Sequence, residues 1–234
     1  MNIKPITTKV FAENEDLFAF VTRFIKRAPE RSVIVITSKI VALSEGRTAK
    51  LGTEKEKEAL IRSESEFALE TEYVWLTIKD GMLVANAGVD ESNADGKIVL
   101  LPKDSYKAAS EMRKKLMKHY GVKELGVLIT DSRLLPLRAG VVGVALGYAG
   151  FKGIRDYRGT PDIFGRKLTM TRTDVADALA TTAVLPMGEG KECRPLAIIT
   201  GAEIEFTDRV NKKELLIPIE EDVYGPMFRK IGKK

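Results

Sequence analysis

Three acidic residues could hold a divalent metal ion, because each lies among small residues at the end of a predicted helix or strand. They are Asp90 in the segment NAGVDESN (86–93), Asp131 in ITDS (129–132) and Glu189 in MGEG (187–190). Proteins bind Mg²⁺ and Mn²⁺ through one or two carboxylates plus phosphate and water oxygens, and a tight turn lets a phosphate approach. The same residue types also form ordinary turns, and spacing alone favours that simpler interpretation.

Basic residues are the other candidates for binding. The run RDYR (155–158) could hold a carboxylate or phosphate between guanidinium groups, or could form a surface ion-pair network. Ser38 and Lys39 could contact phosphate or lie on the pleat of a strand. His119 is expected to interact with the C-terminus of its helix. With one histidine and one cysteine, Cys193, the sequence offers no recognisable catalytic triad, so a nucleophilic enzyme is not supported.

Composition narrows the class of protein. The chain has 234 residues, 44% of them hydrophobic, which is enough for one large core or two small ones. Its net charge of +5 favours anionic ligands only weakly, and no nucleic-acid-binding signature occurs. A Cys/His zinc site cannot be built from one cysteine and one histidine, so a bound metal would need oxygen ligands. No segment resembles a signal peptide or a membrane span, and the prediction is a cytoplasmic protein.

Periodicity predicts the elements that position these residues. An α+β fold with mixed sheets and flanking helices is expected, and Asp80-Gly81 predicts a hairpin turn. The unbroken apolar run 33–36 predicts a strand covered on both faces. The predicted helices are 16–27, 53–70, 104–120 and 173–186. The predicted strands are 33–36 with its continuation 37–43, 73–79, 82–87, 98–101, 125–130 and 195–200.

A glycine-rich segment, 140–159, follows Asp131. It contains neither a P-loop nor a dinucleotide-binding fingerprint. Glycine at this density permits close strand packing with bulges, or close approach of backbone N–H groups to an anion, and both interpretations stay open. No repeat or linker divides the chain, so residues 1–234 are predicted to form one unit of two interwoven lobes.

Six motifs occur together and in a fixed order: SKIVALSEGR, NAGVDESN, ITDS, GVVGVALGYAG, DYRGTPDIFGRKL and DVADALATTAVLPMGEG. In this combination the chain resembles the coenzyme F420-0:L-glutamate ligase family, over residues 5 to 205. The resemblance implies that family's two-lobed fold and a homodimer.

The resemblance also implies an activity. It indicates a ligase that uses GTP or ATP to join the amine of L-glutamate to an acceptor carboxylate through an acyl phosphate, with F420-0 or a reduced folate as acceptor. Two Mg²⁺ or Mn²⁺ ions are implied as cofactors, with K⁺ as a further candidate. The alternative is a catalytically inactive relative that keeps the fold as a nucleotide-binding or regulatory module. No nucleic acid or membrane partner is implied.

Roles are transferred by position. Asp90 and Asp131 correspond to catalytic residues and ligands of the first metal, and Ser132 and Glu189 to ligands of the second, whereas Glu91 is expected to be solvated. Arg155, Arg158 and Arg166 become candidates for binding the acidic substrates. The residues that match nucleotide-binding positions are Thr8, Lys9, Val10, Phe11, Ser38, Lys39, Asn93, Met187, Gly188, Gly190, Lys191 and Arg194.

The sequence departs from the family pattern at two places. Leu43 stands where the family commonly has a lysine that contacts the nucleotide. After Asp131 the family usually has a Phe/Asn-Gly-Arg turn, whereas this chain has RLLPL (133–137). The second departure adjoins the predicted metal site and bears on the identity of the acceptor.

Overall fold

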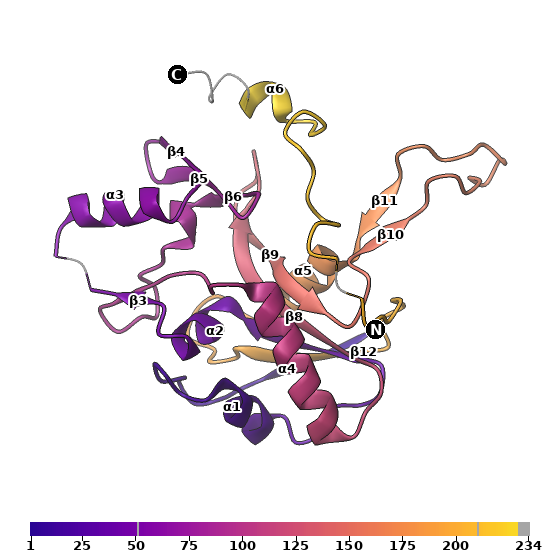
Figure 1. Cartoon of the computed structure of the whole chain (residues 1–234), viewed down its shortest axis with the longest axis horizontal. Helices are drawn as coiled ribbons and strands as arrows, with labels where there is room; N and C mark the ends of the chain where they lie inside the picture. Colours follow the sequence, from indigo (N-terminus) through magenta and orange to yellow (C-terminus); the bar gives the residue numbers. More distant parts are fainter. Residues whose placement is uncertain (51, 210, 229–234) are drawn as a thin grey trace.

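The centre of the molecule is a five-stranded sheet with the order β1-β12-β2-β8-β9 (Figure 1). The computed structural model describes residues 1–50, 52–209 and 211–228, and it has the predicted α+β fold. β2 and β8 run parallel, while the other neighbouring strands of this sheet are antiparallel, so the sheet is mixed. Its strands are β1 (Asn2–Ile6), β2 (Ser32–Thr37), β8 (Leu125–Leu134), β9 (Val141–Ala149) and β12 (Leu196–Thr200).

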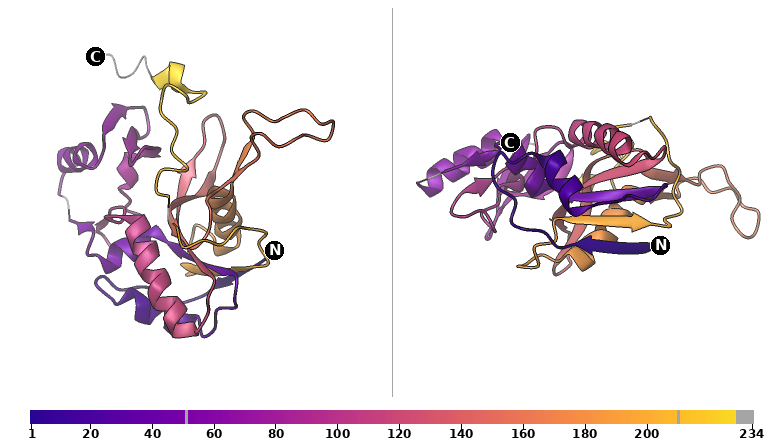
Figure 2. Two further views of the ribbon diagram at one scale, coloured as in Figure 1. Left: turned by 45° about the vertical axis from the view of Figure 1, so that its right-hand side comes forward. Right: turned by 90° about the horizontal axis from the view of Figure 1, so that it is seen from below.

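Helices cover both faces of this sheet. α1 (Leu17–Phe24) and α4 (Ser105–Tyr120) lie on one face and α5 (Val175–Met187) on the other, and Figure 2 shows α4 and α5 on opposite sides. Because successive strand residues point to opposite faces, each face of β2 enters a different core.

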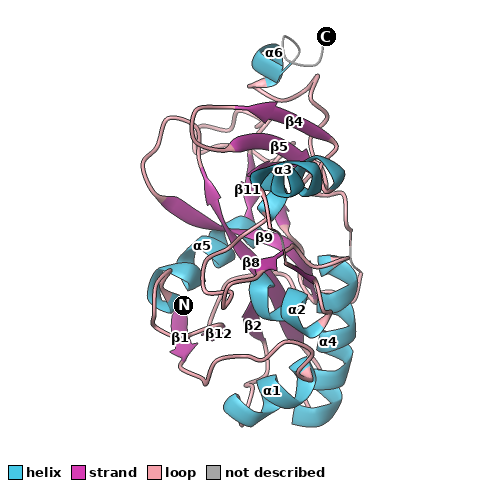
Figure 3. Ribbon diagram, turned by 90° about the vertical axis from the view of Figure 1, so that its left-hand side faces the viewer, coloured by secondary structure: helices cyan, strands magenta, loops and turns pink. Residues whose placement is uncertain are grey.

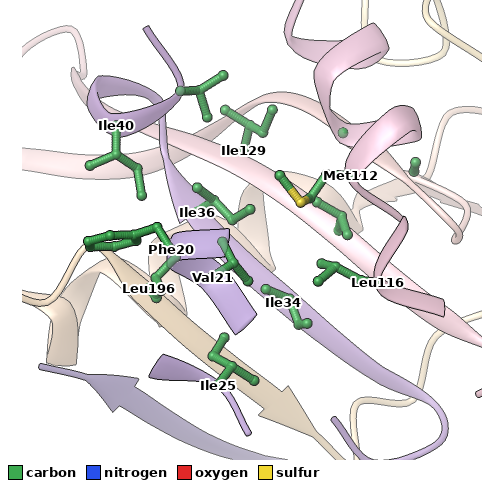
Figure 4. Close-up of a cluster of buried hydrophobic side chains, with 14 of the residues drawn as sticks. Phe20, Val21, Ile25, Ile34, Ile36, Ile40, Met112, Leu116, Ile129 and Leu196 are labelled. Atoms are coloured by element: carbon green, nitrogen blue, oxygen red, sulfur yellow. The ribbon is translucent and has the colours of Figure 1, made fainter. Parts of the chain in front are cut away.

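The two cores confirm the prediction that the run 33–36 is covered on both faces. Ile34 and Ile36 pack in the core on the α1 and α4 side, which Figure 4 shows. Val33 and Val35 pack in the second core, against α5. All four side chains are almost completely buried, and burial of each contributes about 1.5–3 kcal/mol.

A smaller group of elements lies at one end of the molecule, where Figure 3 shows α3 beside β4 and β5. The predicted Asp80-Gly81 hairpin is confirmed, because both residues have positive φ, 52° and 72°, as a type I′ turn requires. The elements are β3 (Thr48–Ala49), α3 (Glu54–Ser63), β4 (Phe67–Glu70), β5 (Trp75–Lys79), β6 (Met82–Ala85), the 3₁₀ turn η1 (Asn86–Gly88) and β7 (Ile98–Val99).

A long hairpin projects from the α5 side of the molecule (Figure 1). It consists of β10 (Ile154–Asp156) and β11 (Arg172–Asp174), with residues 157–171 as its loop. After β12 the chain continues to the short helix α6 (Gly225–Phe228). Among the described residues no helix is both long and apolar enough to cross a membrane.

Three predicted elements differ from the structure. The strand expected to continue through 37–43 is instead the helix α2 (Ser38–Ser44), whose apolar side chains enter the core. The helix expected over 53–70 ends at Ser63, and Phe67 begins β4. Asp131 does not end its strand, because β8 pairs with β9 as far as Leu134.

The glycine-rich segment forms β9, and its glycines serve close packing. A Cβ on Gly143 would lie 2.5 Å from the carbonyl oxygen of Ala180 in α5, and a Cβ on Gly147 would lie 2.5 Å from the backbone of Ser105 and Tyr106 in α4. At these two positions α5 and α4 approach β9 so closely that no side chain would fit between them. The packing interpretation of this segment is therefore confirmed at these two glycines.

The N-cap of α5 gives a prediction about pH. The Asp174 carboxylate accepts a hydrogen bond from the Asp177 N–H, while burial and the Asp177 carboxylate raise the pKa of Asp174 to about 6, from an ordinary 3.8. The folded protein therefore binds this proton more tightly than the unfolded chain, and the free energy of unfolding falls as pH rises from about 4 to 6. Asp174→Asn keeps a capping residue and should raise stability by about 1 kcal/mol at pH 7.5.

Thermal unfolding at pH 4.5 and 7.5 measures this difference. Asp16→Asn, at the N-cap of α1, controls for the change of capping residue. A variant with the same pH dependence of Tm as the wild type would contradict the role of Asp174.

Candidate active site

One cleft, of about 760 Å³, opens beside the end of β8. Segments far apart in the sequence form its walls: residues 8–11, the start of α2, residues 84–95, the end of β8, and residues 187–195 after α5. Every predicted metal-binding or nucleotide-binding residue lines it. These are Asp90, Asp131, Ser132, Glu189, Thr8, Lys9, Val10, Phe11, Ser38, Lys39, Asn93, Met187, Gly188, Gly190, Lys191 and Arg194.

The parallel pairing of β2 with β8 brings the first of these residues together. Thr37 and Thr130 are the last partners in that pairing. The residues that follow them, Ser38 and Asp131, are therefore neighbours, and the Ser38 hydroxyl donates to Asp131 Oδ1 at 2.9 Å. β2 ends here because the helix α2 begins at Ser38. Beyond Thr130, β8 therefore has no β2 partner, and Asp131 faces the cleft.

Asp90 is held in a tight turn after β6. The turn contains Asn86 and Ala87 with positive φ, and Asp90 forms a backbone bridge with Val99. Lys39 Nζ donates to Asp90 Oδ2 at 2.7 Å. Burial opposes ionisation of Asp90, but the hydrogen bonds from Lys39 and from the Ser92 N–H outweigh it, so the pKa of Asp90 lies below its usual range. Asp90 is thus an anion paired with a cation.

Ser132 points to the other side of β8 from Asp131, as adjacent strand residues do. Its hydroxyl donates to Glu189 Oε1 at 2.6 Å. Glu189 follows α5, which ends where Gly188 has a φ of 83°. The two sides of β8 therefore present two different oxygen pairs to one cleft.

Arg133 is a residue of the cleft to which sequence reasoning gave no role. Because β8 continues to Leu134, Arg133 lies on the same side of the strand as Asp131, and its Nη1 forms an ion pair with Asp131 Oδ2. Its side chain is only 7% exposed. Residues two apart in a strand point to the same side, so the sequence would have indicated the Asp131–Arg133 pair only if the strand 125–130 had been predicted to continue to Arg133.

The oxygen donors of the cleft suit a hard divalent cation in kind. Among the described residues, however, no three Asp, Glu, His or Cys side chains come together as a metal site. A cation held by Asp90, Asp131, Ser132 or Glu189 would complete its shell with water or phosphate oxygens, as Mg²⁺ commonly does. In this structure the Asp90 carboxylate forms an ion pair with Lys39 and the Asp131 carboxylate forms one with Arg133.

The three arginines predicted to bind substrate do not line this cleft. They lie in the projecting hairpin: the side chain and the backbone N–H of Arg158 donate to the Asp156 carboxylate and lower its pKa to about 2. Arg155 donates to the carbonyl oxygen of Glu203, and the Arg166 N–H donates to Asp162 at 2.9 Å. The run 155–158 thus contains the surface ion pair that was the alternative to anion binding, between Arg158 and Asp156. Substrate binding by the three arginines stays a prediction.

Two further residues are placed by the structure. His119 lies in the last turn of α4 and packs edge-on against the rings of Phe18 and Tyr120. Leu43, where the resemblance leads us to expect a lysine, lines the cleft and makes its wall apolar at that position.

Comparison with known proteins agrees with the geometry. The family model for F420-0:gamma-glutamyl ligase matches residues 5–201. Coenzyme F420:L-glutamate ligase of Methanococcus maripaludis strain C7 is 36% identical, over 96% of this chain and 97% of the relative. The enzymes of the same name from Archaeoglobus fulgidus and Methanocaldococcus jannaschii are 31% and 42% identical, over 90% and 62% of this chain and 90% and 58% of the relative. The chain therefore belongs to the F420-0:gamma-glutamyl ligase family.

Proposed function

We propose that this protein is a γ-glutamyl ligase that joins the amine of L-glutamate to an acceptor carboxylate. Membership of the family supports the ligase activity. The observation that carries the assignment to this cleft is the meeting of acidic oxygens, lysines and glycine-rich backbone from five distant segments. Such a set suits a phosphorylated nucleotide and a carboxylate substrate together.

An acyl phosphate is the proposed intermediate. The acceptor carboxylate attacks the γ-phosphorus of GTP or ATP and displaces the nucleoside diphosphate. The glutamate amine then attacks the acyl carbon, loses a proton and releases phosphate as the amide bond forms. Positioning and charge neutralisation are sufficient for this route, which needs no protein nucleophile.

The residues of the cleft divide between these tasks. We assign Asp90, Asp131, Ser132 and Glu189 to Mg²⁺ or Mn²⁺, which when bound neutralises phosphate charge in the transition state. The basic side chains Lys9, Lys39, Lys191 and Arg194 lie where they can bind phosphate oxygens.

The acceptor is proposed to be coenzyme F420-0, or a reduced folate. The end of β8 and the loop that follows it expose Leu134, Leu135 and Leu137, and Leu134 and Val141 line the cleft. This apolar margin suits an acceptor whose carboxylate is attached to a ring system. This region includes residues 133–137, where the resemblance leads us to expect a different sequence.

A homodimer is the proposed assembly. The β10–β11 hairpin projects from the rest of the chain, and its loop exposes Ile163 and Phe164 by 92% and 89%. Two such side chains on a projecting hairpin are suited to burial against a second copy. Light scattering should give twice the chain mass, and Ile163→Glu with Phe164→Glu should give the monomer mass. A monomeric wild type at micromolar concentration would contradict this proposal.

A coupled assay tests the ligase activity. Release of GDP or ADP is followed with Mn²⁺, L-glutamate and each acceptor in turn, and mass spectrometry should show addition of glutamyl residues. Leu43 in the cleft favours the alternative of an inactive nucleotide-binding relative. Nucleotide binding without turnover on any acceptor would establish that alternative and exclude the ligase.

A further inference from the structure

The guanidinium group of Arg133 is buried with only part of its hydrogen-bonding capacity used. Nη1 donates to Asp131 Oδ2 and to the carbonyl oxygen of Ser132 at 3.2 Å. Nε and Nη2 are buried and have no acceptor among the described residues. No other buried side-chain nitrogen or oxygen in the described part of the chain lacks a partner.

These two nitrogens represent a substantial energetic deficit. Leaving a buried donor unsatisfied costs about 1–3 kcal/mol, and more for a charged group. Nε and Nη2 lie on one edge of the planar guanidinium, and their parallel N–H bonds match the two oxygens of a carboxylate or phosphate. The unused edge is therefore the part of the side chain best shaped for a two-oxygen anion.

Its location connects this edge with the reaction. Arg133 lines the cleft together with Asp131 and with Leu134 and Val141 of the apolar margin. The side chain borders the cleft, but Nε and Nη2 are themselves buried, so a change of rotamer is needed to bring this edge to a ligand. Two hydrogen bonds to an anionic group, at about 1.5–3 kcal/mol each, offset the cost of that change, which includes the ion pair with Asp131.

We propose that Arg133 binds the anionic group of a substrate, a carboxylate or a phosphate, through its Nε and Nη2 edge. This proposal rests on the proposed function, in which the cleft receives both kinds of anion. The contact gives the cleft an anion-binding arginine in addition to the lysines.

Calorimetry on the full-length protein with Mg²⁺ tests the proposal. The probes are a non-hydrolysable nucleoside triphosphate, L-glutamate and a carboxylate-bearing acceptor. Arg133→Lys keeps the charge but removes the two-pronged edge, Arg133→Met removes both, and the exposed Arg27→Lys is the matched control. Both Arg133 variants should raise the Kd of one probe at least tenfold, and the control should change none.

The identity of the affected probe assigns the anion. Weaker nucleotide binding assigns a phosphate, and weaker binding of glutamate or acceptor assigns a carboxylate. If every Kd stays within twofold in the folded variants, or the wild type binds none of the probes, the proposal is overturned. A fall in Tm of more than about 10 °C in both variants would assign a purely structural role and overturn it too.

These binding constants are independent of turnover. A wild type that binds the probes but forms no amide would refute the ligase activity while leaving the role of Arg133 measurable. Loss of affinity in the variants together with normal wild-type turnover supports both.

Discussion

Asp90→Asn is expected to lower kcat at least about 10³-fold, or about 4 kcal/mol of transition-state stabilisation, while the protein stays folded. Asparagine keeps an oxygen that can accept from the Ser92 N–H, but it removes the charge that pairs with Lys39 and that would hold a divalent cation. The Lys39–Asp90 pair is partly exposed, with side chains 25% and 44% accessible. Its loss should therefore lower stability by about 1 kcal/mol or less.

The adjacent residue provides the control. Glu91 belongs to the same turn but forms an ion pair with Lys57 and does not line the cleft. Glu91→Gln should leave kcat within about twofold of the wild type. The coupled nucleotide-release assay measures both variants, and thermal unfolding verifies the fold. Retention of turnover by Asp90→Asn would remove Asp90 from the reaction, and a large fall in Tm would make it a structural residue.

Gly147→Ala is expected to destabilise the protein by about 3 kcal/mol, the largest stability change predicted for this chain. The added Cβ would lie 2.5 Å from backbone atoms of Ser105 and Tyr106, which cannot move aside as a flexible side chain can. Either β9 or the first turn of α4 must shift, and both are packed in the centre of the molecule. Urea unfolding measures the change as a lower midpoint.

Gly52→Ala is the matched control. A Cβ there would approach only the Glu56 side chain, at 3.6 Å, and the residue is exposed. Its stability should change by less than about 0.5 kcal/mol. Equal midpoints for the two variants would show that α4 does not rest on Gly147 as closely as described.

The central sheet was predictable because its strands show simple patterns. The unbroken β-branched run 33–36 indicated a strand covered on both faces, and both cores contain its side chains. The helix α2 was not predictable in the same way. Ile40, Val41 and Ala42 continue the apolar run, and periodicity alone does not distinguish a buried strand from a buried helix. In the helix, Ile40 and Val41 pack in one core, and Ala42 packs against Val99 in another cluster.

The residues of the cleft were predictable as a set only through the order of the family motifs. Spacing could not indicate that residues 8, 38, 90, 131 and 189 meet, because the strand order of the sheet brings them together. Arg133 was missed for a local reason. Its pairing with Asp131 requires β8 to continue to Leu134, and that continuation depends on β9, which the glycine-rich sequence left open between two interpretations.

The continuation of β8 also determines which wall of the cleft can move. Asp131 and Ser132 are paired with Val144 and Gly143 of β9, inside the most extensively paired strand of the sheet. Local opening requires the least energy where few backbone hydrogen bonds must break. Admission of substrate and release of product should therefore depend on movement of the cleft walls that belong to no strand, residues 91–95 and 188–194, while the β8 wall stays in place.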